Sequence, residues 1–385
     1  MSIEVLGVLV HRNGSEISPP SGPLFDVPMI QRLAHDFDAN GYDRVLILQN
    51  SFAPDPLVIA THAATVTRRL AFMVAHRPGF IAPTMAARMF ATLDHISGGG
   101  RVGVHIITGA NDTELQCDGD FLTKEQRYHR SAEYVRAMRA VWSSTTPVDF
   151  NGEFYRFNKA LSELRPVTAA GIPIYWGGAS PLAIEKAAEC ADVYAFGGLK
   201  PLDQMRQDVA AVQALAMKAG RTVRLQTSVR VILGETEAAA WAEARRVVDR
   251  LGEVALEQRR ALERDGGAVR TGMRLDKALA TTKGGTGRGE LERIATGPEV
   301  LDKRLWTGIT RASIDFATPT LPPALVGTAE QVADAIMDYH AMGITGFLIR
   351  GFDLLGDIET HGRELIPRLR MLAGAAKKPV GAKNS

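Results

Sequence analysis

The stretch Ile172-Pro-Ile-Tyr-Trp-Gly-Gly-Ala-Ser-Pro181 joins an apolar strand, a glycine pair and a helix start. Gly177 and Gly178 let the backbone approach a ligand closely. Ser180 can cap the helix that follows, and Pro181 suits the first helical position. Because free N–H groups at a helix start attract anions, the stretch predicts a phosphate cradle. The alternative is an ordinary strand-to-helix turn, since glycine-rich turns are common in α/β proteins.

The composition is typical of a soluble globular protein. The chain has 385 residues, of which 45% are hydrophobic and 23% charged. The net charge of +2 gives no indication of a nucleic-acid partner, and no apolar run has the roughly 18 residues of a membrane span. Only Cys117 and Cys190 are present, which argues against a disulfide framework. No export signal precedes the first strand, so we expect a cytoplasmic protein.

Apolar runs rich in β-branched residues alternate with helical patterns along the chain. We expect eight strands, at Ile3–Val10, Arg44–Leu48, Leu70–Ala75, Arg101–Ile107, Ile172–Trp176, Val193–Phe196, Arg224–Leu233 and Gly346–Arg350. We expect helices between them, at Val27–Asn40, Asp55–Thr65, Pro83–Ile96, Lys124–Trp142, Pro181–Glu189, Pro201–Ala219, Thr236–Leu251 and Ala329–Met342. Eight strand–helix pairs predict an α/β fold of the (β/α)₈ TIM-barrel type. A doubly wound sheet is the competing interpretation, because both folds bury a parallel sheet on two faces.

Two segments interrupt this alternation. Residues 143–168 carry a short strand signal of their own around Glu153–Phe157. Residues from about 252 to 326 form a longer insertion, with a helical start and then a glycine-rich, charged stretch, and such insertions in barrels are often lids or interfaces. An insertion without function is the alternative. We expect one domain over residues 1–370 and a flexible tail over 371–385.

In a barrel, the carboxyl ends of the strands carry the site. Here those ends supply a polar, cationic set of residues that includes His11, Arg77, Asn111, Arg230 and Arg350. The histidines lack metal-ligand spacing, so no metal site is expected. Neither a nucleophile elbow nor a phosphate-binding P-loop is present, and the first strand–helix turn has no GxGxxG motif.

The sequence from His76 to Gly109 closely resembles the bacterial luciferase-like flavin monooxygenases, and its nearest branch is alkanesulfonate monooxygenase. Further matches lie at Asp118–Leu122 with Arg127 and Tyr128, and at Asp149–Phe154. The matches continue with Ile172–Ser180, and with Leu325–Thr328 before the last helix, strand and Arg350-Gly-Phe. The resemblance covers about residues 1–370.

This resemblance implies a TIM barrel that binds reduced FMN (FMNH₂), uses O₂ and receives its flavin from a separate NAD(P)H-dependent reductase. The implied reaction cleaves the C–S bond of an organosulfonate to give an aldehyde and sulfite. A homo-oligomer, dimer or tetramer, is also expected. The resemblance places the cofactor on Thr108, Tyr128, Gly177, Gly178, Ala179 and Ser180, and we expect His11, Arg77 and Arg230 to serve the substrate.

The residues expected near the substrate differ from those of the alkanesulfonate monooxygenases. Ser51 stands where alkanesulfonate enzymes carry a cysteine, Ser228-Val-Arg230 replaces Arg-x-His, and Phe352 replaces a tyrosine. Residues 317–322 replace a glycine-rich loop that carries an arginine. An anionic organosulfur compound is the expected substrate, with a sulfosugar or a sulfone as alternatives.

Two other functions stay open. A flavin-storage or flavin-binding protein would explain the cradle without monooxygenation, and the same barrel also serves hydride transfer with a deazaflavin. Each substrate residue also has a structural interpretation, since Arg77 and Arg230 can be ion-pair partners and His11 can simply end a strand. Six cations of the long insertion are candidate lid contacts for an anion: Arg264, Arg270, Arg274, Lys277, Lys283 and Arg288.

Overall fold

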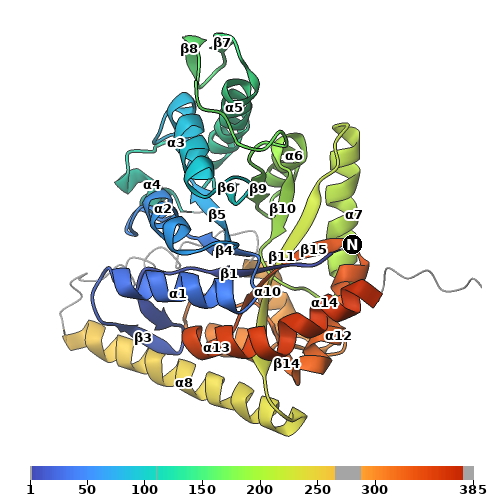
Figure 1. Ribbon diagram of the computed structural model, residues 1–385. Helices are drawn as coiled ribbons and strands as arrows, with labels where there is room; N and C mark the ends of the chain where they lie inside the picture. The colour runs from blue at the N-terminus through green and yellow to red at the C-terminus, as the bar shows by residue number, and fades with distance from the viewer. Residues whose placement is uncertain (1, 110, 265–287, 376–385) are drawn as a thin grey trace, which may run out of the picture.

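A computed structural model describes residues 2–109, 111–264 and 288–375, without the side chains of 261–264 and 288. Eight parallel strands form its centre (Figure 1). They are β1 (Glu4–Val8), β4 (Arg44–Ile47), β5 (Ala71–His76), β6 (Val102–Ile106), β9 (Ile174–Gly177), β10 (Val193–Phe196), β11 (Arg224–Leu233) and β15 (Ile344–Arg350). The eight predicted strands are confirmed, with bounds that differ by at most two residues.

The strands close into a ring. Around the barrel they run β1, β4, β5, β6, β9, β10, β11 and β15, and β15 pairs with β1. Closure comes from the pairing of β10 with β11, in which Val193 lies opposite Arg224 and Phe196 opposite Thr227. The fold is therefore the predicted (β/α)₈ barrel, and the doubly wound alternative is excluded, because an open sheet would have two free edges.

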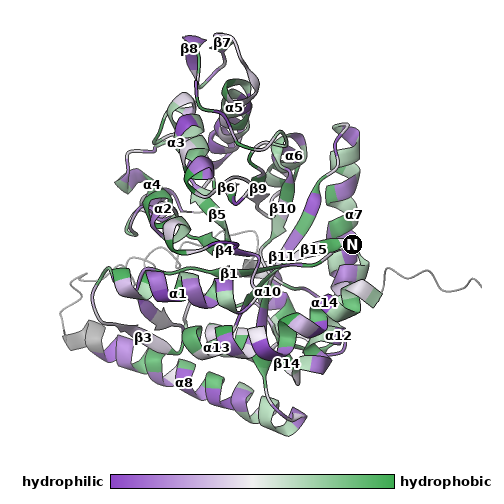
Figure 2. Cartoon of the chain, viewed as in Figure 1, coloured by the Kyte–Doolittle hydropathy of each residue, from purple (hydrophilic) through white to green (hydrophobic). Residues whose placement is uncertain are grey.

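Helices cover the outside of the ring. They are α1 (Val27–Ala39), α2 (Pro56–Val66), α3 (Pro83–Ile96), α5 (Lys124–Ser143), α6 (Pro181–Cys190), α7 (Leu202–Lys218), α8 (Glu237–Arg264) and α12 (Ala329–Ala341). In α1, Ile30, Leu33, Ala34 and Phe37 are buried at helical spacing. Hydrophobic and hydrophilic residues alternate along the ribbons of α1 and α8 accordingly (Figure 2).

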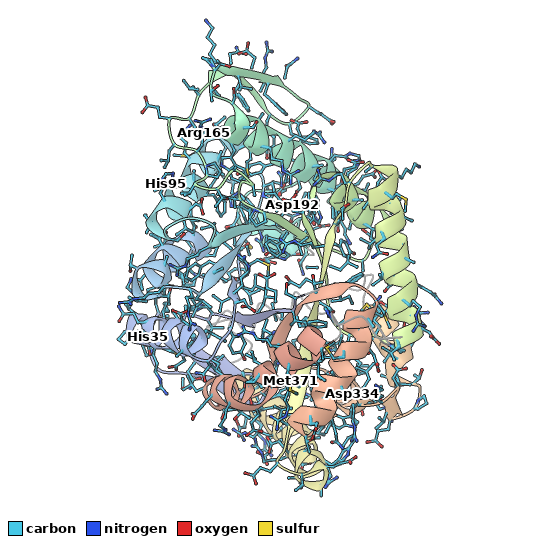
Figure 3. The ribbon with its side chains drawn as sticks, turned by 45° about the vertical axis from the view of Figure 1, so that its right-hand side comes forward. His35, His95, Arg165, Asp192, Asp334 and Met371 are labelled. Carbon is cyan, nitrogen blue, oxygen red and sulfur yellow. The ribbon has the colours of Figure 1, made fainter. Side chains whose placement is uncertain are left out.

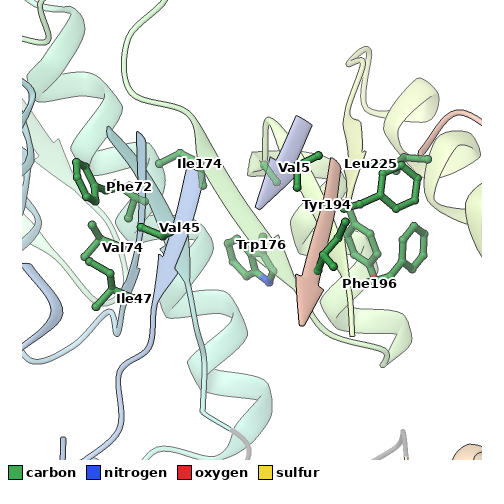
Figure 4. Close-up of a cluster of buried hydrophobic side chains, with 14 of the residues drawn as sticks. Val5, Val45, Ile47, Phe72, Val74, Ile174, Trp176, Tyr194, Phe196 and Leu225 are labelled. Atoms are coloured by element: carbon green, nitrogen blue, oxygen red, sulfur yellow. The ribbon is translucent and has the colours of Figure 1, made fainter. Parts of the chain in front are cut away.

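Two layers of side chains fill the core. Between strands and helices, residues such as Val45, Phe72, Val74, Ile174 and Trp176 form the larger cluster (Figure 4). The barrel interior has its own cluster, made by Leu6, Val8, Met73, Tyr175, Val193 and Leu348. Because strand side chains alternate between these layers, the strands read as nearly continuous apolar runs.

The segment 143–168 contains a hairpin of β7 (Val148–Asn151) and β8 (Arg156–Ala160), which extends beyond α5 at one end of the molecule (Figure 1). The predicted strand signal at Glu153–Phe157 thus falls on its turn and second strand. Nε2 of His95 on α3 contacts the carbonyl oxygen of Arg165 at 2.9 Å, which fastens the following segment (Figure 3).

The long insertion begins with the expected helical segment, which is the second half of α8. Helix α8 continues without a break past residue 251 to Arg264. After the gap come α10 (Arg288–Ala295), β12 (Val300–Leu301), β13 (Leu305–Trp306), α11 (Gly308–Asp315) and β14 (Ala324–Gly327). Strand β14 pairs in parallel with the second half of β11, so this part extends the barrel sheet. The other described elements are β2 (Asn13–Ser15), β3 (Ser18–Ser21), α4 (Asp112–Cys117), α13 (Leu354–Thr360), a π-helix at His361–Leu365 and α14 (Ile366–Ala375).

Of the expected tail, residues 371–375 belong to α14, and the rest lies outside the described residues. None of the helices described here combines the length and the apolar character that crossing a membrane requires.

Carboxylates at the amino-terminal face of the barrel hold the starts of the strands. Asp43 Oδ2 accepts from Val5 N at 2.8 Å, and Asp38 Oδ1 accepts from Leu70 N at 3.0 Å. Asp192, labelled in Figure 3, accepts from Ile174 N at 2.8 Å and from Nη2 of Arg139 at 2.8 Å. These side chains satisfy backbone donors that a barrel end would otherwise leave without partners.

Two buried histidines should make stability depend on pH. Burial lowers the pKa of His76 and of His361 to about 4, and each ring contacts a tyrosine hydroxyl at 2.8 Å. Between pH 6.5 and 4 the unfolded chain binds more protons than the folded one, so the free energy of unfolding must fall as the pH falls through this range. Each histidine should cost about 2 kcal/mol between pH 7 and pH 5.

Urea unfolding of wild type and His361→Gln at both pH values measures this effect. The variant should lose about 2 kcal/mol less than wild type on acidification. Equal losses in the two proteins would show that the pKa of His361 is the same in the folded and the unfolded chain.

Candidate functional site

The stretch predicted to form a phosphate cradle lies where β9 meets α6. Ser180 caps α6, its Oγ accepting from Ala183 N at 3.2 Å, and Pro181 is the first helical residue. Gly178 has φ +134°, a conformation that favours glycine, and a Cβ there would lie 2.7 Å from Cβ of Ala183. Glycine is therefore needed here, because the turn approaches Ala183 and Tyr128 too closely for a side chain.

Tyr128 faces the same place from α5. Its side chain is buried, and its hydroxyl lies 3.2 Å from the position that a Cβ of Gly178 would occupy. The preceding residue, Arg127, is 1% exposed and donates to the carbonyl oxygen of Thr108 at 3.0 Å and to Oδ1 of Asp112 at 2.7 Å. Arg127 thereby fixes the start of α5 against the segment that follows β6.

The predicted cofactor residues thus fall into one neighbourhood. Gly177, Gly178, Ala179 and Ser180 are consecutive at the end of β9, and Tyr128 contacts the space beside Gly178. Thr108 joins them through Arg127. Ala179 is exposed and Ser180 half-buried, so a ligand can reach the helix start.

A cavity of about 400 Å³ opens at the carboxyl ends of β1 and β4. The segment 9–16 lines one side, α8 another and residues 318–321 a third. His11 lies in its wall and stacks on Phe25, with ring centroids 6.4 Å apart. Burial, with a further contribution from the Arg12 guanidinium, lowers the pKa of His11, so the ring is neutral near pH 7 and can accept a proton.

Arg230 is held by an ion pair instead of lining this cavity. Its side chain is 4% exposed, pairs with Glu16, donates to the carbonyl oxygen of Gly351 at 2.7 Å and lies 5.0 Å from the Phe352 ring centroid. Glu16 also lies 3.5 Å from Nη2 of Arg350. Burial favours a raised pKa for Glu16, but the two guanidiniums outweigh it and lower the pKa on balance.

Arg77 is paired in a similar way. It is 5% exposed and forms an ion pair with Glu114, and it donates to Oγ of Ser51 at 2.9 Å. Ser51, where the resembling branch carries a cysteine, is thus part of this cluster. Among His11, Arg77 and Arg230, only His11 lines the cavity, and whether the two arginines serve a substrate stays a prediction.

Sequence reasoning missed Glu16 as a site residue. It follows β2 in the loop of the β2–β3 hairpin, more than 200 residues from Arg230 in sequence. The cluster of asparagine, glycine, serine and proline from Asn13 to Ser21 was the available signal, because such residues indicate turns. Of the expected lid cations, Arg270, Arg274, Lys277 and Lys283 lie outside the described residues, and the side chains of Arg264 and Arg288 are outside them too.

Within the described ranges, no group of histidine, cysteine, aspartate and glutamate side chains is arranged to hold a metal ion.

Solved structures of other proteins share this fold. A riboflavin lyase with modified FMN and riboflavin has a TM-score of 0.75 at 17% identity, over 97% of this chain and 92% of that one. The EDTA monooxygenase from Chelativorans sp. BNC1 has a TM-score of 0.73 at 17% identity, over 100% of this chain and 97% of that one. An F420-dependent secondary alcohol dehydrogenase with an F420-acetone adduct has a TM-score of 0.66 at 16% identity, over 96% of this chain and 100% of that one.

The family model described as luciferase-like monooxygenase matches residues 3–346. This match covers most of the chain, including all of the barrel strands but the end of β15. The chain belongs to the luciferase-like monooxygenase family, whose members are flavin- or F420-dependent oxidoreductases.

Proposed function

We propose that the protein is the oxygenase of a two-component system that uses FMNH₂ and O₂ to cleave an organosulfonate. The observation that carries this proposal is the pairing of an anion cradle at the α6 N-terminus with a separate cavity whose wall contains guanidiniums. The first suits the FMN phosphate and the second an anionic substrate. A sulfonate, O₂ and FMNH₂ would give an aldehyde, sulfite, FMN, water and one proton, with one oxygen atom in the aldehyde and the other in water.

The residues of the cradle fit the FMN phosphate. Ser180 bonds the N–H groups of Ala183 and Ile184, and Pro181 has none, so the donors beside Gly178 are the hydroxyls of Ser180 and Tyr128 and the N–H of Leu182. The flavin, when bound, supplies the two electrons that activate O₂. His11, neutral at pH 7, can take a proton at its ring nitrogen within the cavity.

Deazaflavin chemistry is the second candidate, and the structural likeness to an F420-dependent dehydrogenase favours it. Flavin storage is a third possibility for the same cradle. For the proposed function, the partner is a cytoplasmic NAD(P)H-dependent flavin reductase, and the oxygenase itself is a homo-oligomer.

Anaerobic titration with FMNH₂, followed by admission of air and a panel of sulfonates, distinguishes these functions. The proposal expects FMNH₂ binding and one sulfite per FMNH₂ consumed, less the fraction lost as peroxide. Binding with peroxide release alone would support storage. Tight binding of coenzyme F420 in place of FMNH₂ would support the dehydrogenase.

The cradle is tested by Ser180→Asp. Aspartate can still cap α6, so the fold should survive, but its charge opposes the phosphate dianion. We expect FMNH₂ binding to weaken by about 1–3 kcal/mol. Binding of riboflavin, which lacks the phosphate, is the matched measurement and should change little; wild type that binds riboflavin and FMN equally would refute the phosphate site.

His11 is tested by His11→Asn, which keeps a polar side chain in the cavity wall. If the ring handles a proton, kcat should fall about 10²- to 10⁴-fold, while the Kd of the substrate should change far less. A loss confined to Kd would assign His11 to binding alone.

A further inference from the structure

We propose that the 400 Å³ cavity takes an organic anion with one acid group and an apolar body, and that Arg350 holds the acid group. This inference rests on the proposed function, because it specifies the substrate class of the same oxygenase.

The walls of the cavity are mostly apolar. They combine residues from the ends of β1 and β4, from α8 and from the loop before β14: Val10, Leu48, Pro54, Leu251, Val254 and Leu321. Its volume lies within the range of about 300–1,000 Å³ that ligand pockets occupy. A cavity of this size and lining favours a hydrocarbon body over a sugar, whose hydroxyls would need polar partners.

The polar part of the wall has an excess of positive charge. Arg12 and Arg350 both line the cavity, and Glu16 is the one acidic residue among the described residues that do. Glu16 is already shared between Arg350 and the buried Arg230 behind it. Two guanidiniums around one carboxylate leave a net positive charge, which a single anionic group on a ligand would balance.

Of the two arginines around Glu16, Arg350 is the one that a ligand can reach. Its side chain is 38% exposed, whereas that of Arg230 is 4% exposed. Arg230 has its donors on Glu16 and on the carbonyl oxygen of Gly351. Burial and the nearby Arg230 lower the pKa of Arg350 to about 10, so the group remains charged at pH 7 but lies where a further anion is favourable.

Arg12 adds a second donor to the same wall. It lines the cavity, and its positive charge helps to lower the pKa of the neighbouring His11. A second positive charge in the wall adds to the attraction that the cavity exerts on an acid group. Arg350 and Arg12 together therefore make the cavity selective for an anion, while Arg230 positions Glu16.

The experiment uses the linear sulfonates from methanesulfonate to octane-1-sulfonate, with octyl methyl sulfone as the neutral probe. Calorimetry measures Kd without flavin, and turnover with FMNH₂ measures kcat/KM. In wild type, binding should tighten up to about fourfold for each added methylene until the cavity is full. Arg350→Met should weaken sulfonate binding about 10- to 100-fold, keep the chain-length dependence and change sulfone binding little.

Two further variants, Arg350→Lys and Arg246→Met, serve as controls for Arg350→Met. Arg350→Met leaves Glu16 paired with Arg230, so the fold should persist, and Arg350→Lys should restore part of the sulfonate binding because it keeps the charge. Arg246→Met is the matched control, since Arg246 is exposed on α8 and pairs with Glu243 on the same helix. It should leave every value unchanged.

The outcomes separate the inference from the proposed function. Binding of octane-1-sulfonate that depends on Arg350, without sulfite release, would support the inference and refute the function. If the rate of sulfite release changes neither with the chain length of the sulfonate nor with the substitution of Arg350, the proposed function is supported and the inference is overturned. Equal losses for sulfonate and sulfone in Arg350→Met would also overturn it.

Discussion

The closure of the barrel depends on β11, which pairs with three strands. Its first half pairs with β10 and so closes the ring, and on its other side Leu225 to Arg230 pair with β15. Its second half continues beyond the ring and pairs with β14, so that Arg230 lies opposite both Ala324 and Arg350. The same strand thus completes the fold and brings the two arginines together at the carboxyl face.

The two ends of the barrel are chemically different. At the amino-terminal face, Asp38, Asp43 and Asp192 accept from backbone N–H groups and fix the starts of the strands. At the carboxyl face, Arg230 and Arg350 gather around Glu16. This division follows the usual separation in such barrels, where one face contributes stability and the other carries the loops that bind ligands.

The strands and the turn from β9 into α6 could be predicted from the sequence because both depend on local patterns. Buried parallel strands are apolar throughout, and a glycine pair followed by Ser180-Pro181 defines a helix start without reference to distant residues. The state of Arg77 and Arg230 could not be predicted, because their partners, Glu114 and Glu16, lie in other loops. The helical start of the insertion could also be predicted, because Leu251, Val254 and Ala255 keep the helical spacing that places them in the cavity wall.

A cation at a strand end is therefore a weak indicator of an anion site by itself. Arg230 and Arg350 lie side by side in register, yet one has its charge balanced by Glu16 and a carbonyl oxygen, whereas the other remains accessible in the cavity wall. A carboxylate on a β-hairpin makes the difference, because it neutralises the deeper arginine and leaves the outer one short of negative charge. In this fold, shared at under 20% identity with enzymes of unlike names, such loop residues rather than the strands would set what the cavity accepts.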